Sequence, residues 1–252
     1  MRDEESKEQS YSAVPNPFTS TGKFIGRVRS VAREKGIVHL AYWSLWIASQ
    51  YVVNPPVFLY YKLFTHRDSF QFMGNSYDYL CRFYNSTWKS QRAIEVPIGY
   101  RLLKQYEGKR ILEFGNVMEH YFPSSHEVLD KYEKADGVIN EDVVSFNPGK
   151  EYDLILSIST LEHVGWDEIP KEEGKIPKAV ENLKGLLAKE GLLFMTMDVG
   201  YNQELDSLLA GDALGFDEIY YMKRTSRDNK WMQVNKEEMG NSQGVAIGII
   251  KK

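Results

Sequence analysis

Short apolar runs alternate with helix-like segments through the second half of the chain. Residues 110–114 (RILEF), 152–159 (YDLILSIS) and 192–197 (LLFMTM) are apolar runs of the kind that predict buried strands. Between the last two, residues 176–189 place their apolar side chains at helical spacing, and Gly191 follows them. Strands that alternate with helices in this way predict a parallel sheet with crossover helices.

Weaker patterns complete the expected sheet. Residues 127–129 and 137–144 are shorter strand candidates, and late strands are expected at 218–223, 231–234 and 245–250. An antiparallel hairpin formed by the late strands would close one edge of the sheet. We therefore expect an α/β fold over residues 108–252: a Rossmann-like, doubly wound, mostly parallel sheet of seven strands with a C-terminal antiparallel hairpin.

The first hundred residues follow a different pattern. Residues 1–21 are polar and contain few apolar side chains, which predicts a flexible tail. Residues 22–107 are expected to form a helical, aromatic-rich N-terminal extension. Within it, residues 23–35 interleave basic and apolar positions, as in an amphipathic helix. Residues 37–64 are unusually aromatic and are interrupted by Asn54-Pro55-Pro56.

Two interpretations of residues 24–64 stay open. The aromatic side chains suit a lid over a substrate cleft or a homodimer contact. They equally suit a peripheral membrane contact, with the basic segment beside anionic head groups. A membrane span is not expected, because the apolar run from 37 to 53 has 17 residues and a spanning helix needs about 20.

Composition narrows the class of protein. The net charge of -4 provides no broad basic field, so a nucleic-acid partner is not expected. The single cysteine, Cys81, cannot form an intramolecular disulfide, and no spacing of Cys and His predicts a metal site. The polar N-terminus does not resemble a secretory signal. We expect a cytoplasmic protein, membrane-associated if the aromatic segment contacts lipid.

Candidate binding residues follow the first and second strands of the sheet. In an open parallel sheet, ligands bind at the carboxyl ends of the strands where the strand order reverses. Glu113 ends the first strand, and Gly115 with Asn116 forms a turn that allows close approach of a ligand. The residues after this turn are expected to begin a helix. Asp130 follows the second strand, where a carboxylate accepts hydrogen bonds from a ribose diol. A solvated aspartate at the end of a strand would give the same pattern.

The third and fourth strands add further candidates. Glu141 and Asp142 follow the third strand, where they either contact an adenine edge or belong to a polar loop. Ser159, Glu162 and His163 follow the fourth strand. The imidazole of His163, assisted by Glu162, suits the removal of a proton from an acceptor hydroxyl or amine. A histidine that only shapes the pocket is the alternative.

Together, ILEFG, Asp130, INEDV, YDLILSISTLEHVG and AVENLKGLLAKEGLLFMTM resemble the class I S-adenosylmethionine-dependent methyltransferases, in the group with an LEHV-like segment after the fourth strand. The resemblance covers roughly the last 145 residues. It implies that S-adenosylmethionine is the cofactor and that Glu113, Gly115 and Asn116 flank its methionine part. It also implies that Asp130 binds the ribose, that Asp142 or Glu141 lies by the adenine, and that the segment from Ser159 to His163 faces both cofactor and acceptor.

One departure from the family pattern leaves two functions open. The family usually has a GxGxG turn after its first strand, whereas this chain has one glycine, Gly115, followed by Asn116, Val117 and Met118. The resemblance implies O- or N-methylation of a small-molecule or glycan acceptor. The alternative is a catalytically degenerate methyltransferase fold that binds a nucleotide-like ligand or a protein partner.

Overall fold

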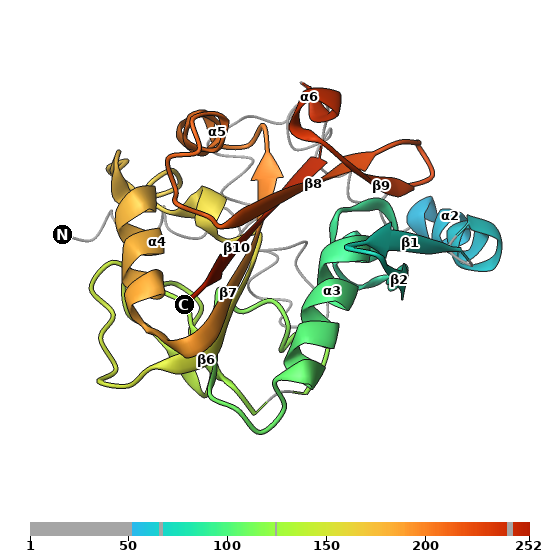
Figure 1. Cartoon of the computed structure of the whole chain (residues 1–252). Helices are drawn as coiled ribbons and strands as arrows, with labels where there is room; N and C mark the ends of the chain where they lie inside the picture. Colours follow the sequence, from blue (N-terminus) through green and yellow to red (C-terminus); the bar gives the residue numbers. More distant parts are fainter. Residues whose placement is uncertain (1–51, 66–67, 124, 241–243) are drawn as a thin grey trace, which may run out of the picture.

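A computed structural model describes residues 52–65, 68–123, 125–240 and 244–252 (Figure 1). The predictions for the tail at 1–21, the basic segment and most of the aromatic segment therefore lie outside the described residues. None of the helices within the described ranges combines the length and apolar character of a membrane span.

The centre of the molecule is an eight-stranded sheet. Its strands are β3 (Ile111–Phe114), β4 (Glu127–Leu129), β5 (Val138–Ile139), β6 (Tyr152–Ile158), β7 (Leu187–Val199), β8 (Glu218–Arg224), β9 (Trp231–Val234) and β10 (Gly244–Lys251). They lie in the order β5-β4-β3-β6-β7-β10-β8-β9. The first five pair in parallel, whereas β10 runs antiparallel between β7 and β8, and β9 is antiparallel to β8. The predicted fold class is confirmed, with eight strands rather than seven.

Helices cover both faces of this sheet (Figure 1). Helix α3 (Arg92–Gln105) packs on one face, and α4 (Lys175–Gly185) and α5 (Gln203–Ala210) pack on the other. The short α6 (Lys236–Met239) adjoins β8. Strand β6 supplies both cores, with Leu156 and Ile158 toward α3 and Ile155 toward α4. Burial on both faces explains why β6 reads as a continuous apolar run.

The connections among β3, β4, β5 and β6 are loops. We expected a helix after Gly115, but the described residues between β3 and β4 form turns, and no helix separates β4, β5 and β6. These segments are rich in residues that favour turns, including Pro123, Gly137, Pro148 and Gly149. The carboxyl edge of β3 and β4 is consequently built from loops, whose backbone groups and side chains shape the site.

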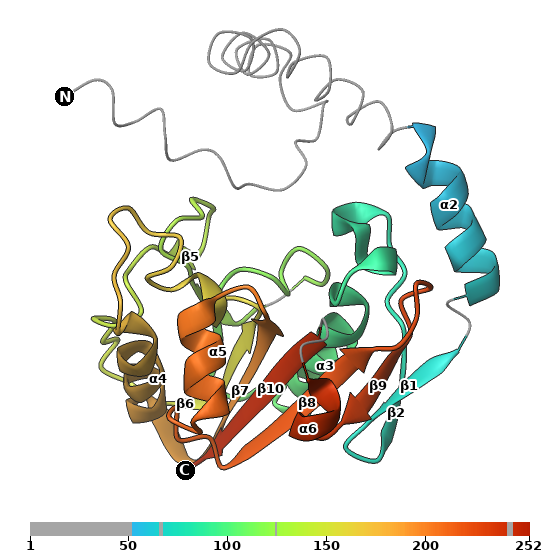
Figure 2. The same ribbon diagram turned by 90° about the horizontal axis from the view of Figure 1, so that it is seen from above.

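The N-terminal extension contains a β-hairpin that we did not expect. It comprises α2 (Asn54–Tyr60), the π-helical turn η1 (Tyr61–Thr65), the hairpin strands β1 (Ser69–Phe72) and β2 (Asn75–Asp78), and the 3-10 turns of η2 (Tyr84–Lys89). The hairpin lies beside β9 (Figure 2), and Phe70 and Phe72 are buried in the core that α3 shares with the sheet. Helix α2 has no buried residue and exposes Leu59 and Tyr60.

Side chains from the extension reach the last strands of the sheet. The Tyr79 hydroxyl accepts a hydrogen bond from the Trp231 amide at 2.9 Å and donates to its carbonyl at 3.5 Å. The Asn229 side-chain amide donates to the Ser90 carbonyl at 2.9 Å, and Lys230 pairs with Asp68 at 2.7 Å. Residues 68–107 are thus packed on the sheet and do not form a core of their own.

Candidate functional site

The ends of β3, β4 and β6 converge at the point where the strand order reverses. Phe114 pairs with Leu129 of β4 and with Ser157 of β6, so the residues after these strands share one edge. The Asn116 amide lies 3.4 Å from Asp130 Oδ2. Gly115 has a φ of +87°, and a Cβ at this position would clash with the Thr160 side chain. Strands β4 and β5 extend from one side of β3 and β6 lies on the other, which is where doubly wound sheets bind ligands.

Glu113 is occupied by its own loop. One carboxylate oxygen accepts hydrogen bonds from the amides of Val117 at 2.7 Å and Met118 at 2.6 Å, and the other lies 2.6 Å from His126 Nε2. The Met118 side chain is fully buried in the core beside Gly99 of α3. The partly buried Val117 packs against the same core. Glu113 shapes the turn through contacts that the sequence pattern did not reveal.

Asp130 and Asn116 retain capacity to accept hydrogen bonds. Asp130 Oδ1 accepts from the amides of Tyr132 and Glu133, both at 2.8 Å. Within the described ranges, Oδ2 has only the 3.4 Å contact with the Asn116 amide. The Asn116 side-chain nitrogen donates to Glu133 at 3.0 Å, and its buried oxygen has no partner among the described residues. Buried acceptors without partners are rare in folded proteins and point to a missing donor.

Asp142 belongs to an ion network at the rim of this edge. It lies 2.9 Å from Lys131 Nζ and 2.7 Å from Lys175 Nζ, and Glu168 pairs with the same two lysines. Although burial opposes the charge, hydrogen bonds from Lys175 and Lys131 lower the pKa of Asp142 to about 2. Its neighbour Glu141 is exposed. The network ties the loop after β5 to the loop before α4.

His163 and Glu162, adjacent in sequence, lie in opposite environments. The His163 side chain is 46% exposed, and its Nδ1 lies 2.5 Å from Asp167 Oδ2. The Tyr201 hydroxyl donates to the same oxygen at 2.8 Å, and the Tyr201 and His163 rings are 4.8 Å apart. Glu162 is 1% exposed, and burial raises its pKa to about 8, with Glu95 and Asp198 acting in the same direction.

Helix α3 contributes charged residues that we did not predict for the site. Glu95 Oε1 accepts hydrogen bonds from the hydroxyls of Ser159 at 2.5 Å and Thr196 at 2.7 Å, and Oε2 pairs with Arg92 at 2.8 Å. Burial raises the pKa of Asp198, at the end of β7, to about 6. The signal in the sequence is a charged pair at i and i+3 inside an apolar helical run, a pattern in which the charges are seldom buried without a purpose.

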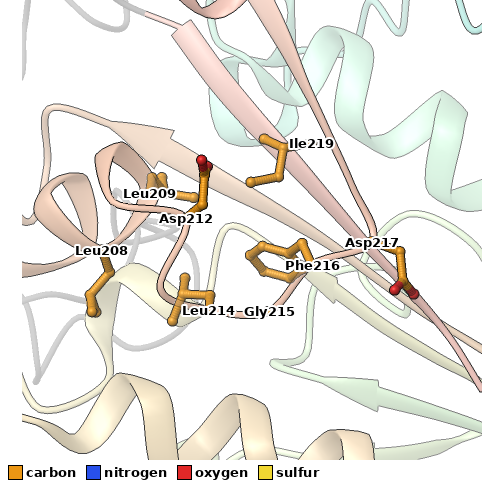
Figure 3. Close-up of a pocket in the computed structure, with 8 residues that line it drawn as sticks. All are labelled: Leu208, Leu209, Asp212, Leu214, Gly215, Phe216, Asp217 and Ile219. Carbon is orange, nitrogen blue, oxygen red and sulfur yellow. The ribbon is translucent and has the colours of Figure 1, made fainter.

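A surface hollow lies away from these residues. It is lined by Leu209, Leu214, Phe216, Ile219 and neighbouring residues between α5 and β8, with a volume of about 240 Å³ (Figure 3). In the sheet, β8 is separated from β3 by β6, β7 and β10, so the hollow lies away from the ends of β3 and β4. Within the described ranges, no group of three His, Cys, Asp or Glu side chains is arranged to hold a metal ion.

No family model and no curated protein matches this sequence. Several solved structures are similar in fold. The N-methyltransferase NodS from Bradyrhizobium japonicum is 14% identical, with 65% of this chain and 92% of that chain covered and a TM-score of 0.39. A TehB-like S-adenosylmethionine-dependent methyltransferase from Corynebacterium glutamicum is 21% identical, with 60% and 86% covered and a TM-score of 0.41. The sugar N-methyltransferase KedS8 from a Streptoalloteichus species is 12% identical, with 64% and 88% covered and a TM-score of 0.38.

Proposed function

We propose that this chain is an S-adenosylmethionine-dependent methyltransferase acting on a small-molecule or glycan acceptor. The observation that carries the proposal is the convergence of Gly115, Asn116, Asp130 and Thr160 at the reversal of strand order. A ligand that lies across this edge would contact the Asp130 carboxylate, the Asn116 side-chain oxygen that has no partner among the described residues, and the backbone turn at Gly115. In sites of this topology, a carboxylate binds the ribose and a glycine turn lets the backbone approach the ligand closely.

The chemistry of the available groups fits the cofactor. Asp130 Oδ2 would accept from the ribose hydroxyls, and the orphaned Asn116 oxygen would accept from a further donor on the ligand. Glu141 is exposed beside the same edge, whereas Asp142 and Glu113 act through the loops that they hold. When bound, S-adenosylmethionine supplies a methyl group on a sulfonium that is already reactive toward nucleophiles. The protein's own contribution is then mainly to position the acceptor and exclude water.

We assign the role of general base to His163. Asp167 and Tyr201 hold the Nδ1 side of the ring, so Nε2 is left to accept a proton from the acceptor. A carboxylate that orients a histidine in this way also stabilises the imidazolium that forms. Ser159, predicted to face the cofactor, donates its hydroxyl to Glu95 and thereby fixes the end of β6 against α3.

Calorimetry with S-adenosylhomocysteine tests cofactor binding directly. Asp130→Asn should weaken binding about tenfold, because the amide oxygen is needed by the Tyr132 and Glu133 amides and a nitrogen then replaces the oxygen that would accept from the ribose. The matched control is Asp136→Asn, which changes an exposed aspartate in the same loop. No binding by the wild-type protein at millimolar ligand would instead favour the degenerate methyltransferase fold, as would equal binding by ATP and S-adenosylhomocysteine.

A kinetic experiment tests His163. Transfer of labelled methyl groups from S-adenosylmethionine would be measured over a panel of glycans and amines to find an acceptor. With that acceptor, His163→Ala should lower turnover about 100-fold, a typical contribution of general base catalysis. Affinity for S-adenosylhomocysteine should change less than about twofold, because the proton transfer takes place on the acceptor side. Unchanged turnover removes His163 from the mechanism.

A further inference from the structure

Arg92 presents a partly buried guanidinium with unused donors. It lies in the first turn of α3, and its side chain is 16% exposed. Nη1 donates to Glu95 at 2.8 Å and to the Ile158 carbonyl at 3.3 Å. Nε and Nη2 have no acceptor among the described residues. A guanidinium prefers to bind a carboxylate through two parallel hydrogen bonds, so these two nitrogens are suited to an anionic group.

Glu162 presents the complementary unused acceptor. Its Oε1 accepts from the Asp198 amide at 3.3 Å, whereas its buried Oε2 has no partner within the described part of the chain. The charged side chains that act on it are Arg92 and Glu95 from α3 and Asp198 from β7. An unpaired buried carboxyl oxygen is costly unless a ligand completes it.

We propose that Arg92 and Glu162 form a subsite for an α-amino acid zwitterion, the amino acid end of S-adenosylmethionine. Free guanidinium donors suit the α-carboxylate, and the free Glu162 oxygen, beside Asp198, suits the α-ammonium. A ligand that carries a carboxylate and an ammonium on one carbon can bind both the Arg92 donors and the Glu162 oxygen. A simple anion or a simple amine can bind only one of the two. The inference rests on the proposed function, because it concerns how the same cofactor is held.

The position of the subsite agrees with the single-glycine turn. Arg92 contacts the carbonyl of Ile158, and Thr160, two residues later, contacts Gly115. A ligand whose ribose lies by Asp130 therefore reaches Arg92 by crossing Gly115. The amides of Val117 and Met118 already bind Glu113, so this turn has few free amides to offer. Side chains from α3 and from the segment after β6 replace the backbone contacts that a glycine-rich turn would supply.

Two ligands that differ only in the amino acid end test the subsite. S-adenosylhomocysteine carries the zwitterion, and 5′-methylthioadenosine lacks it. Arg92→Met should weaken binding of S-adenosylhomocysteine about 30-fold, as expected for lost hydrogen bonds to a charged group. Binding of 5′-methylthioadenosine should change less than about twofold. Arg101→Met, an exposed change further along α3, is the matched control and should alter neither affinity.

Proton release gives a second readout that does not depend on turnover. An ammonium beside Glu162 favours its ionised form, so S-adenosylhomocysteine should release close to one proton on binding near pH 7. Calorimetry in buffers of different ionisation enthalpy measures this number. Glu162→Gln should abolish the release and keep the fold, because glutamine can accept the Asp198 amide. 5′-Methylthioadenosine should release no proton from either protein.

The outcomes separate the two proposals. Failure of both ligands to bind overturns the proposed function, and the subsite with it. Binding of S-adenosylhomocysteine that is insensitive to Arg92→Met overturns the subsite alone, and so does an equal loss of both ligands. If Arg92→Met fails to fold, the test is the number of protons that wild type and Glu162→Gln release on binding S-adenosylhomocysteine. Equal proton release by the two proteins overturns the subsite.

Discussion

At the scale of single residues, the site depends on which polar atoms are already paired. Glu113, Asp142 and Ser159 follow or end strands at the predicted edge of the sheet. Each of these side chains, however, already forms a hydrogen bond or an ion pair with another residue of the chain. The sequence identifies where an acidic or hydroxyl side chain falls along the chain, but its partners come from distant segments. His126 and Glu95, which bind Glu113 and Ser159, follow no recognisable spacing relative to them.

Glu162 makes a prediction about stability and pH. It stays protonated in the folded protein to about pH 8 and ionises in the unfolded chain near its ordinary pKa of 4.5. Between these values unfolding releases a proton, so each pH unit lowers the free energy of unfolding by about 1.4 kcal/mol, and the loss ends above pH 8. Glu162→Gln removes this dependence, so its stability relative to wild type should rise from pH 5 to pH 8.

Urea unfolding of the ligand-free proteins at several pH values measures the difference. Burial also raises the pKa of Asp198, to about 6, but that group is present in both proteins. The difference between wild type and Glu162→Gln therefore isolates Glu162 as long as the mutation leaves Asp198 in place. A difference that stays constant from pH 5 to pH 8 would show that Glu162 is ionised in the folded state.

At the scale of elements, strands were predictable and the loops between them were not. β6 and β7 bury both faces, so their apolar runs mark them without reference to the rest of the chain. β5 has two residues, and its pairing depends on β4. The turn after Gly115 was expected to begin a helix, but Glu113 binds the amides of Val117 and Met118 and stabilises a turn. Local hydrogen bonds from a side chain to the backbone compete with helix formation in this way.

The ion network around Lys175 should stabilise two loops at the rim of the site. Its Nζ pairs with Asp142 at 2.7 Å, Glu168 at 2.7 Å and Glu172 at 3.1 Å, and only 4% of the side chain is exposed. Lys175→Met should lower the free energy of unfolding by about 2 kcal/mol, because carboxylates lose a buried partner. Lys178→Met on the exposed face of α4 is the control for chemical denaturation. If Lys175→Met and wild type have equal free energies of unfolding, the ion network does not stabilise the fold.

At the scale of the whole molecule, the sequence predicted the sheet and left the first hundred residues unexplained. The boundary predicted at 108 separates α3 from the strands, yet Ile94, Val96 and Ile98 of α3 are buried in the same core as β6 and β10. The hairpin of β1 and β2 was not predicted because its strands are short and their exposed positions alternate with aromatic ones. Arg92 and Glu95 were not predicted for a different reason, because they lie outside the segment that resembles a known family.

The bond between Tyr79 and Trp231 has a consequence for assembly. An outermost strand displays unpaired amides and carbonyls that another chain can use to extend a sheet. The Tyr79 hydroxyl hydrogen-bonds to both the amide and the carbonyl of Trp231 in β9. A strand from another chain therefore cannot pair with these two groups. At the opposite border the last strand is two residues long, which offers little to pair with. Self-association by sheet continuation is therefore disfavoured at both borders.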